Sequence, residues 1–388
     1  MTHESLKVAV VLGTRPEIIR LSRVIAALDQ ACNLVIVHTG QNYDYELNEI
    51  FFKELGVRRP DHFLEAAGAS LGETVGAIIA RSEAVLVQER PDAMLVLGDT
   101  NSALSAYVAR RLQIPVYHME AGNRCFDRNV PEETNRTLVD HISDFNLAYT
   151  EHGRRNLLAE GLPARRIYVT GSPMREVLEH YRPLIESSTA LTDLGLVVDG
   201  YILASLHREE NVDSETKLRN LIKSLHQLSE TFSVPVVVST HPRTRARLEA
   251  LDIITDDERI RWLKPFSFFD YNRLQMSALC VLSDSGTIAE EASILGFAAV
   301  TPRLSIERPE AMDTGTIIVC GNRPNDILRA VGRAAASLDR KSREKVSSIV
   351  PDDYSISNTA QRVVNLIVGT ATLSNTWDGI DERVTRLK

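Results

Sequence analysis

The sequence predicts an α/β protein with two Rossmann-like, doubly wound parallel-sheet domains that face each other across a cleft. Strand-like and helical patterns alternate along the chain, as they do where helices cover both faces of a sheet. The chain has 388 residues, whereas a single core rarely grows past roughly 250–300 residues. The alternation pauses at residues 174–200, where a charged segment precedes a turn-rich one. We therefore expect two domains, residues 1–172 and 173–365.

The first expected domain alternates short apolar runs with helical patterns. Its elements are a strand at 7–13, a helix at 16–28, a strand at 33–40, helices near 46–54 and 71–90, a strand–helix–strand unit at 94–122, a helix from Pro131, and strands near 145–149 and 167–173. Continuous apolar runs are typical of parallel strands that are buried on both faces.

The second expected domain repeats this alternation. Its strand-like runs lie at 201–207, 234–241, 259–265, 279–286, 297–302 and 316–321. A last helical segment, TAQRVVNLIVGTA, follows residue 355.

Composition limits the partners. The chain is 44% hydrophobic and 25% charged, with a net charge of −8, which is an ordinary globular balance. Its basic residues are dispersed, which argues against a nucleic-acid partner. No apolar run approaches the roughly 18 residues of a membrane span, and the first residues lack the pattern of a signal peptide. We expect a cytoplasmic protein with no nucleic-acid and no membrane partner.

The four cysteines, Cys32, Cys125, Cys280 and Cys320, lie far apart and form no CxxC pair. This spacing argues against a zinc site or a disulfide framework and suits a reducing compartment. Three of them adjoin apolar runs and are expected in the core. Cys125 lies in a polar loop, where it could be exposed to a ligand.

Two acidic residues follow the strands of the unit at 94–122. Asp99 ends the first strand segment and Glu120 ends the second. A helical crossover makes the two strands parallel. If they are neighbours, both side chains emerge at the carboxyl edge of the sheet, where open α/β sheets bind ligands. This pair is the expected start of an active site.

Glu132 could add a third carboxylate beside these two. It lies in the segment VPEETNR, at the start of a helix. Crowding of carboxylates raises at least one pKa toward the range that is useful for proton transfer. Proline and acids in a first turn also suit a plain helix start, so both interpretations stay open.

The segment Gly13-Thr14-Arg15-Pro16-Glu17 joins a strand to a helix. Free backbone N–H groups at a helix start favour an anion, and Arg15 could pair with a phosphate. An ordinary turn with a surface arginine explains the residues equally well. The segment is not GxGxxG, so a dinucleotide cofactor is not indicated.

A second such junction holds Ser285, Gly286 and Thr287, directly after Asp284. Small hydroxyl residues before a helix suit a diphosphate. Glu290 and Glu291 follow within the first turn, within reach of a ribose hydroxyl. Capping of the helix and complementing of its dipole explain the same residues.

Histidines end two strands of the second half. His207, with Arg208 beside it, and His241 each follow an apolar run. A histidine at a strand end suits a capping role as well as a ligand role, but two on the same edge, with Arg208 adjacent, favour contact with a phosphate or leaving group. His118 lies within a strand and is expected to be buried scaffolding. Arg308 lies in a charged turn, and this pattern alone predicts a solvated loop.

At these residues the chain resembles the non-hydrolysing UDP-N-acetylglucosamine 2-epimerase family. The matching segments are GTRPEII, HTGQNYDYE, LGDTNS, HMEAG, PEETNR, GSP, LHREEN, DSGTIAEEA and ERPEAMDTGT. The resemblance implies a glycosyltransferase-B-like fold with a UDP-binding second domain, and a C-terminal helix at about 366–388 that packs back on the first. It also implies a homodimer, no metal and no other cofactor.

Within that family, GNRCFDRNVPEETNR and HTGQNYDYELNEIFF look most like the branch that makes UDP-N-acetyl-L-fucosamine from UDP-2-acetamido-2,6-dideoxy-L-talose. Classical members carry an AGLRTGD…PWPEE loop, a lysine at the position of Arg20 and QH-type residues at 41–43. Their reaction, UDP-N-acetylglucosamine to UDP-N-acetylmannosamine, is the alternative.

The family's reaction inverts C2 of the sugar. Loss of the C2 proton and of UDP leaves a 2-acetamidoglycal, to which UDP adds back with a proton on the opposite face. By resemblance, Asp99, Glu120 and Glu132 are the acid–base candidates, and His207 assists at the diphosphate. The residues expected to bind UDP and the sugar are Arg15, Arg20, Arg136, His241, Ser285, Gly286, Thr287, Glu291 and Arg308. Domain closure about residues 171–200 would retain the glycal.

Three other functions stay open. Hydrolysis would release the free sugar and UDP. A retaining glycosyltransferase of the same fold would need an acceptor surface, and no amphipathic basic segment suggests one. An inactive sugar-nucleotide sensor would not need the three carboxylates and His207.

Overall fold

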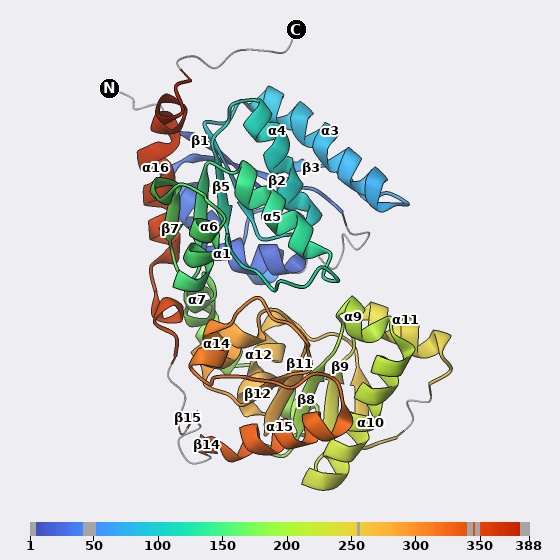
Figure 1. The fold of residues 1–388 in the computed structure, drawn as a ribbon. Coiled ribbons are helices and arrows are strands. Elements are labelled where there is room, and N and C mark those ends of the chain that lie inside the picture. The colour runs from blue at the N-terminus through green and yellow to red at the C-terminus, as the bar shows by residue number, and fades with distance from the viewer. Residues whose placement is uncertain (1–4, 42–51, 254–256, 340–343, 346–349, 381–388) are drawn as a thin grey trace. The chain divides into compact units, whose positions relative to one another are not determined.

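The computed structural model describes residues 5–41, 52–253, 257–339, 344–345 and 350–380. Most of the helix expected near 46–54, and most of the HTGQNYDYE segment, lie outside these residues. The chain divides into two compact units: unit 1 comprises residues 1–177 and the chain from Ile356, and unit 2 comprises Leu178–Ser355 (Figure 1). The domain boundaries expected at residues 172 and 365 stay a prediction.

Unit 1 is built on a seven-stranded parallel sheet in the order β3-β2-β1-β4-β5-β6-β7. The strands are β1 (Lys7–Leu12), β2 (Asn33–His38), β3 (His62–Phe63), β4 (Ala93–Leu97), β5 (Val116–Met119), β6 (Phe145–Ala148) and β7 (Ile167–Val169). The strand order reverses direction between β1 and β4, and such a switch point is where doubly wound sheets bind ligands. β4 and β5 are parallel neighbours, so Asp99 and Glu120 follow adjacent strands, as expected from the sequence.

The helices of unit 1 follow the strands in alternation (Figure 1). They are α1 (Arg15–Ala31), α3 (Leu71–Glu89), the 3₁₀ turn η1 (Asn101–Ser105), α4 (Ala106–Arg111), α5 (Glu132–Ile142), α6 (Glu151–Ala159), the 3₁₀ turn η2 (Ala164–Arg166) and α16 (Thr359–Trp377). A further helix, α7 (Met174–Glu186), continues from unit 1 into unit 2.

The helix α16 belongs to unit 1 although it lies far along the chain. It begins at Thr359, earlier than the expected start near 366, and it packs against α1. Val363 and Ile367 are fully buried in it. The Thr370 hydroxyl lies 2.6 Å from the Tyr117 hydroxyl of β5. Unit 1 is therefore completed by a segment that follows unit 2 in the sequence.

Unit 2 holds a six-stranded parallel sheet in the order β10-β9-β8-β11-β12-β13. The strands are β8 (Ile202–Ser205), β9 (Val236–Ser239), β10 (Ile260–Leu263), β11 (Cys280–Ser283), β12 (Ala299–Thr301) and β13 (Ile318–Val319). Here the order reverses between β8 and β11. Separate apolar clusters involve alternate residues of the strands, such as Ala204 and Leu203. Both sheets confirm the predicted α/β class.

The remaining elements of unit 2 are mostly helices. They are α8 (Ala190–Asp193), α9 (Glu209–Val212), α10 (Glu215–Phe232), α11 (Pro242–Ala250), α12 (Phe268–Ser277), α13 (Ile288–Leu295), α14 (Glu310–Asp313), α15 (Pro324–Ala336), the antiparallel pair β14 (Leu338–Asp339) and β15 (Glu344–Lys345), and the 3₁₀ turn η3 (Asp352–Ser355). In the part of the chain that the structure describes, no helix is both long and apolar enough to span a membrane.

Candidate active site

The expected site residues gather at the carboxyl edges of the two sheets, in one cluster per unit. In unit 1 they follow β1, β4 and β5 or lie on α1 and α5, and they are Arg15, Arg20, Asp99, Glu120, Glu132 and Arg136. In unit 2 they follow β8, β9 and β11 or lie beyond β12, and they are His207, His241, Ser285, Gly286, Thr287, Glu291 and Arg308.

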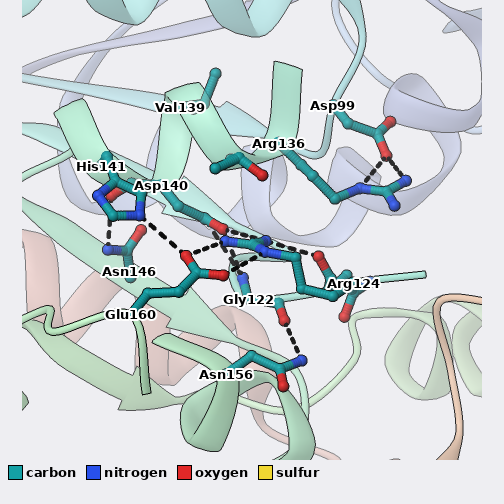
Figure 2. A network of polar contacts seen from close by, with 12 residues as sticks. Asp99, Gly122, Arg124, Arg136, Val139, Asp140, His141, Asn146, Asn156 and Glu160 are labelled. Carbon is teal, nitrogen blue, oxygen red and sulfur yellow. Dashed lines mark hydrogen bonds and ion pairs between the residues drawn. The ribbon is translucent and has the colours of Figure 1, made fainter. Parts of the chain in front are cut away.

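Asp99 lies just beyond β4 and binds a guanidinium of α5. The Nε atom of Arg136 donates to Asp99 Oδ2 at 3.1 Å, and Nη2 of the same side chain also contacts this oxygen (Figure 2). Asn135 donates through Nδ2 to the Asp99 carbonyl at 3.0 Å. Arg136 is only 4% exposed. Two residues that were predicted separately thus form one ion pair.

Glu120 lies just beyond β5 and binds a guanidinium of α1. Its Oε2 atom contacts Nη1 of Arg20, and Asn123 donates through Nδ2 to its Oε1 at 3.3 Å. Glu120 has a φ of 66°, in the left-handed region that non-glycine residues rarely adopt. A Cβ atom on Gly98 would lie 3.2 Å from its Oε2. The carboxylate therefore lies against the backbone that precedes Asp99.

Glu132 is the first residue of α5 and is half-buried. Among the described residues, no hydrogen bond or ion pair joins it to Asp99 or Glu120. The neighbouring Glu133, which sequence reasoning did not single out, instead contacts Arg136 Nη1 at 2.5 Å. The place of Glu132 in the active site therefore stays a prediction.

Cys125 is buried, contrary to the expectation that it could be exposed to a ligand. Its Sγ atom lies 3.2 Å from Glu133 Oε2, and its backbone N–H donates to the same oxygen at 3.3 Å. Burial raises the pKa of the Cys125 thiol. The polar sequence around Cys125 predicted an exposed loop, but the loop folds back onto α5 and buries the thiol.

Glu17 is a buried acid beside the loops of this cluster that sequence reasoning did not single out. It is 1% exposed, and its Oε2 accepts from the Gly13 backbone N–H at 3.0 Å and from the Thr14 hydroxyl at 2.7 Å. Its Oε1 accepts from the Thr100 hydroxyl at 3.0 Å, across the switch point between β1 and β4. Burial raises the pKa of Glu17 to about 7, although these donors act to lower it. The Thr14-x-x-Glu17 spacing of a capping box was the available signal.

Arg15 is the first residue of α1 and is exposed. Its guanidinium is therefore on the surface at a helix start. This placement agrees with either of the two interpretations that the sequence left open.

At the switch point of unit 2, the buried carboxylate of Asp284 organises the loop after β8. It accepts from the backbone N–H groups of His207 and Arg208 at 3.0 and 3.1 Å, and from Asn211 Nδ2 at 3.1 Å. The His207 Nδ1 atom lies 3.3 Å from Asp284 Oδ1. The His241 ring is 5.6 Å from the His207 ring, and its side chain caps α11.

The junction before α13 is approached by two guanidinium groups. A Cβ atom on Gly286 would lie 3.1 Å from Arg208 Nη2 and 3.3 Å from Arg308 Nη1. Arg308 donates to the Gly286 carbonyl at 2.7 Å. The hydroxyls of Ser285 and Thr287 lie 3.0 Å apart. Arginines beside a helix start suit a phosphate group.

Arg308 itself is 4% exposed, so its turn is not the solvated loop that its charge pattern alone indicated. The reason is an ion pair with the fully buried Glu290 at 3.0 Å. Glu291 is held separately, because Gln275 donates through Nε2 to its Oε2 at 2.6 Å. Within the described residues, no three histidine, cysteine or acidic side chains gather as metal ligands would.

A family model described as UDP-N-acetylglucosamine 2-epimerase matches residues 26–368 of this chain. The chain belongs to this family. As an epimerase it is an isomerase, and the family resemblance predicted from the sequence is confirmed.

Relatives of this epimerase share its fold over nearly the whole chain. The structure of the UDP-N-acetylglucosamine 2-epimerase from Rickettsia bellii is 44% identical, with a TM-score of 0.88 over 96% of this chain and 98% of that one. The Methanocaldococcus jannaschii enzyme, solved with UDP-GlcNAc and UDP, is 34% identical, with a TM-score of 0.87 over 94% and 100%.

A relative from Pseudomonas aeruginosa, named UDP-2,3-diacetamido-2,3-dideoxy-D-glucuronate 2-epimerase, is 35% identical over 81% of this chain and 88% of its own length. Family members at similar identity therefore carry names with different sugars. Membership alone does not select the sugar for this epimerase.

Proposed function

We propose that this epimerase inverts C2 of UDP-2-acetamido-2,6-dideoxy-L-talose to give UDP-N-acetyl-L-fucosamine. The observation that carries this choice is the contact between Asn123 and Glu120. Asn123 belongs to the GNRCFD segment, which differs from the AGLRTGD type of the classical enzymes. A segment that touches an acid–base candidate is well placed to adapt the site to a different sugar.

The reaction is an elimination followed by an addition. A carboxylate takes the C2 proton, the C1–O bond breaks, and UDP leaves with the bonding electron pair, so that a 2-acetamidoglycal remains. UDP then adds to C1 while an acid delivers a proton to the other face of C2. Asp99, Glu120 and Glu132 supply these acid–base groups. Arg136 and Arg20 hold the first two carboxylates in place.

UDP is bound by the cluster of unit 2. The diphosphate lies at the junction Ser285-Gly286-Thr287, where Arg208 and Arg308 offset its charge. Glu291, oriented by Gln275, accepts from a ribose hydroxyl. This assignment rests on the approach of both guanidinium groups to Gly286. We propose further that the enzyme is a cytoplasmic homodimer that supplies a sugar for a surface polysaccharide.

The alternative is the interconversion of UDP-N-acetylglucosamine and UDP-N-acetylmannosamine. The names of the Rickettsia bellii and Methanocaldococcus jannaschii relatives favour it. It uses the same acid–base groups and the same UDP site. Only the sugar distinguishes the two reactions.

Proton NMR in D₂O, with each UDP-sugar in a separate tube, tests the choice. We expect conversion of UDP-2-acetamido-2,6-dideoxy-L-talose with deuterium at C2, and no change in UDP-N-acetylglucosamine or in UDP-2,3-diacetamido-2,3-dideoxy-D-glucuronate. Asp99→Asn, the matched control, should turn over at least about 10²-fold more slowly, the usual contribution of a general acid or base. Conversion of UDP-N-acetylglucosamine alone would make the alternative correct, and accumulation of free UDP would identify a hydrolase.

A further inference from the structure

His118, in the HMEAG segment, has no part in the chemistry proposed above, yet it lies between the two loops that carry Asp99 and Glu120. It belongs to β5, and Asp140 of α5 lies beside it. Both residues are completely buried. Burial of an ionisable group costs free energy unless the group is paired, so the contacts of His118 and Asp140 must offset this cost.

The imidazole of His118 contacts one hydrogen-bond acceptor on each side. Its Nδ1 atom lies 2.8 Å from Asp140 Oδ1, and its Nε2 atom lies 2.8 Å from the Gly98 carbonyl oxygen. A neutral imidazole has only one N–H group, so one of these contacts would then place two lone pairs against each other. Both contacts are favourable if both ring nitrogens carry hydrogen, or if Asp140 carries the proton and donates it to Nδ1.

The other contacts of Asp140 decide between these two states, and they favour Asp140 as the anion of the pair. Every group around its carboxylate is a donor: the Gly122 backbone N–H at 3.1 Å and Arg124 Nη1 at 2.7 Å, besides His118. In Figure 2, dashed lines join Asp140 to Gly122 and to Arg124, and Arg124 to Glu160. Apart from His118, no neighbour offers a lone pair to a protonated carboxyl. A carboxylate beside Arg124 makes stronger, charge-assisted hydrogen bonds, so ionisation of Asp140 satisfies the whole set.

The charges continue to alternate beyond Asp140. Arg124 binds Glu160 through Nε at 2.8 Å and Nη2 at 2.7 Å. Burial would raise the pKa of Glu160, but hydrogen bonds from Arg124 and His141 outweigh it and lower that pKa. A cation at His118 thus completes an alternating series of two cations and two anions, so that no buried charge is left without a partner.

We propose that His118 is held as an imidazolium and that, together with Asp140, it positions the loops that carry the catalytic carboxylates. We call His118 and Asp140 the loop clamp. His118 fixes the carbonyl of Gly98, the residue before Asp99, and Asp140 fixes the N–H of Gly122, two residues after Glu120. Neither residue of the clamp touches substrate.

Backbone conformation explains why these loops need such a clamp. Gly98, Glu120 and Gly122 have φ angles of 70°, 66° and 81°. Residues in the left-handed region persist only where the surrounding structure determines them. The clamp supplies two of the fixing hydrogen bonds, and Asn156 adds a third to the Gly122 carbonyl at 2.9 Å.

Nitrogen NMR of the full-length enzyme, labelled at the histidine rings, tests the charge without any substrate. At pH 8 an ordinary histidine is neutral, whereas we expect both nitrogens of His118 to carry hydrogen. His118→Gln identifies this signal among those of the ten histidines. Asp140→Asn should return the ring to a single N–H. A wild-type ring with one bare nitrogen would overturn the proposal, whatever sugar the enzyme uses.

Kinetics test the positioning role, which rests on the proposed function, with whichever UDP-sugar the wild type converts. An asparagine amide can replace Nδ1 and a glutamine amide can replace Nε2, so His118→Asn and His118→Gln each keep one contact and lose the other. We expect each variant to lower kcat about 10²-fold, the cost of a misplacement of about 1 Å, while KM changes less than about threefold.

His141→Gln is the matched control for this measurement. His141 contacts Glu160 at 2.9 Å, at the exposed end of the same network, and the structure places it against neither loop. We expect its kcat to equal that of the wild type. Full activity in both His118 variants would refute the positioning role. If these variants do not fold, the kcat of Asp140→Asn and the wild-type spectrum decide.

Discussion

Asp284 lies beside His207, the residue that the family resemblance places at the leaving diphosphate. Asp284 is fully buried, and its carboxylate holds the backbone of His207 as well as its Nδ1 atom. A carboxylate in this place fixes the tautomer of the imidazole that carries hydrogen on Nδ1.

We expect Asp284→Asn to lower kcat by about 10²-fold or more, because the amide cannot select this tautomer. The steady-state kcat and the Kd for UDP measure the effect, and UDP binding should weaken far less than turnover. Asp257→Asn is the control, since Asp257 makes a similar contact with His226 at 3.0 Å on the surface. Equal effects of the two substitutions would contradict the assignment.

Glu17 makes stability depend on pH in a direction that is unusual for an acid. Its pKa is about 7 in the fold against an ordinary value of 4.5, chiefly because it is buried. The folded state therefore holds the proton more tightly than the unfolded state does. Its contribution is fully present below pH 4.5 and is lost as the pH rises to about 7.

We expect the free energy of unfolding of the wild type, relative to Glu17→Gln, to fall by up to about 3 kcal/mol over this pH range, at about 1.4 kcal/mol per unit. Glutamine does not titrate, so the variant lacks this slope even if it is less stable throughout. The difference in Tm between the two proteins, followed from pH 4.5 to 8, measures it. A constant difference would show that the Glu17 pKa is ordinary.

At the scale of elements, the loop after β5 depends on close contact with α6. A Cβ atom on Gly122 would lie 2.2 Å from the Gly153 carbonyl oxygen, and its φ is 81°. Gly161 has a φ of 85°, but a Cβ atom there would meet nothing within 4 Å. The two glycines share a backbone conformation and differ in the space around them.

We expect Gly161→Ala to cost about 1–2 kcal/mol, the strain of an L-residue in this region, and to lower Tm by about 2–8 °C. Gly122→Ala should cost at least twice as much, because β5 or α6 must also move. Thermal melts of both variants make the comparison. Equal losses would mean that the loop can shift without cost.

The sequence predicted the elements better than the contacts between them. Asp99 and Glu120 were found because short apolar runs end just before them and a crossover makes their strands parallel. The pairing of Glu17 with Thr100 spans 83 residues, and the capping-box pattern explains Glu17 without it. Likewise, the polarity of the segment around Cys125 gave no sign that it folds against Glu133.

At the scale of the molecule, unit 2 is continuous in sequence and unit 1 is not. Residues 178–355 carry their own sheet, whereas unit 1 needs the chain from Ile356 to complete it. Apolar residues of α16, such as Val363 and Ile367, are buried in unit 1. Without α16, this part of unit 1 would face water.

We expect a fragment of residues 178–355 to fold alone and to bind UDP, because both its core and the junction at Gly286 lie within it. A fragment of residues 1–177 should be unfolded or aggregated, and addition of a 356–380 peptide should recover part of its structure. Circular dichroism melts and calorimetric titration with UDP measure these outcomes. Cooperative melting of the 1–177 fragment would show that α16 is dispensable.

The position of α16 also sets an order of events during synthesis. A ribosome makes residues 178–355 between the last strand of unit 1 and the helix that completes it, which takes roughly 10–35 s at 5–20 residues per second. During this interval the nascent first unit exposes the apolar surface that α16 later covers. A chaperone that binds apolar surfaces can bind the nascent first unit during this interval. A chain that is released in this interval carries Asp99 and Glu120 without the finished fold of unit 1.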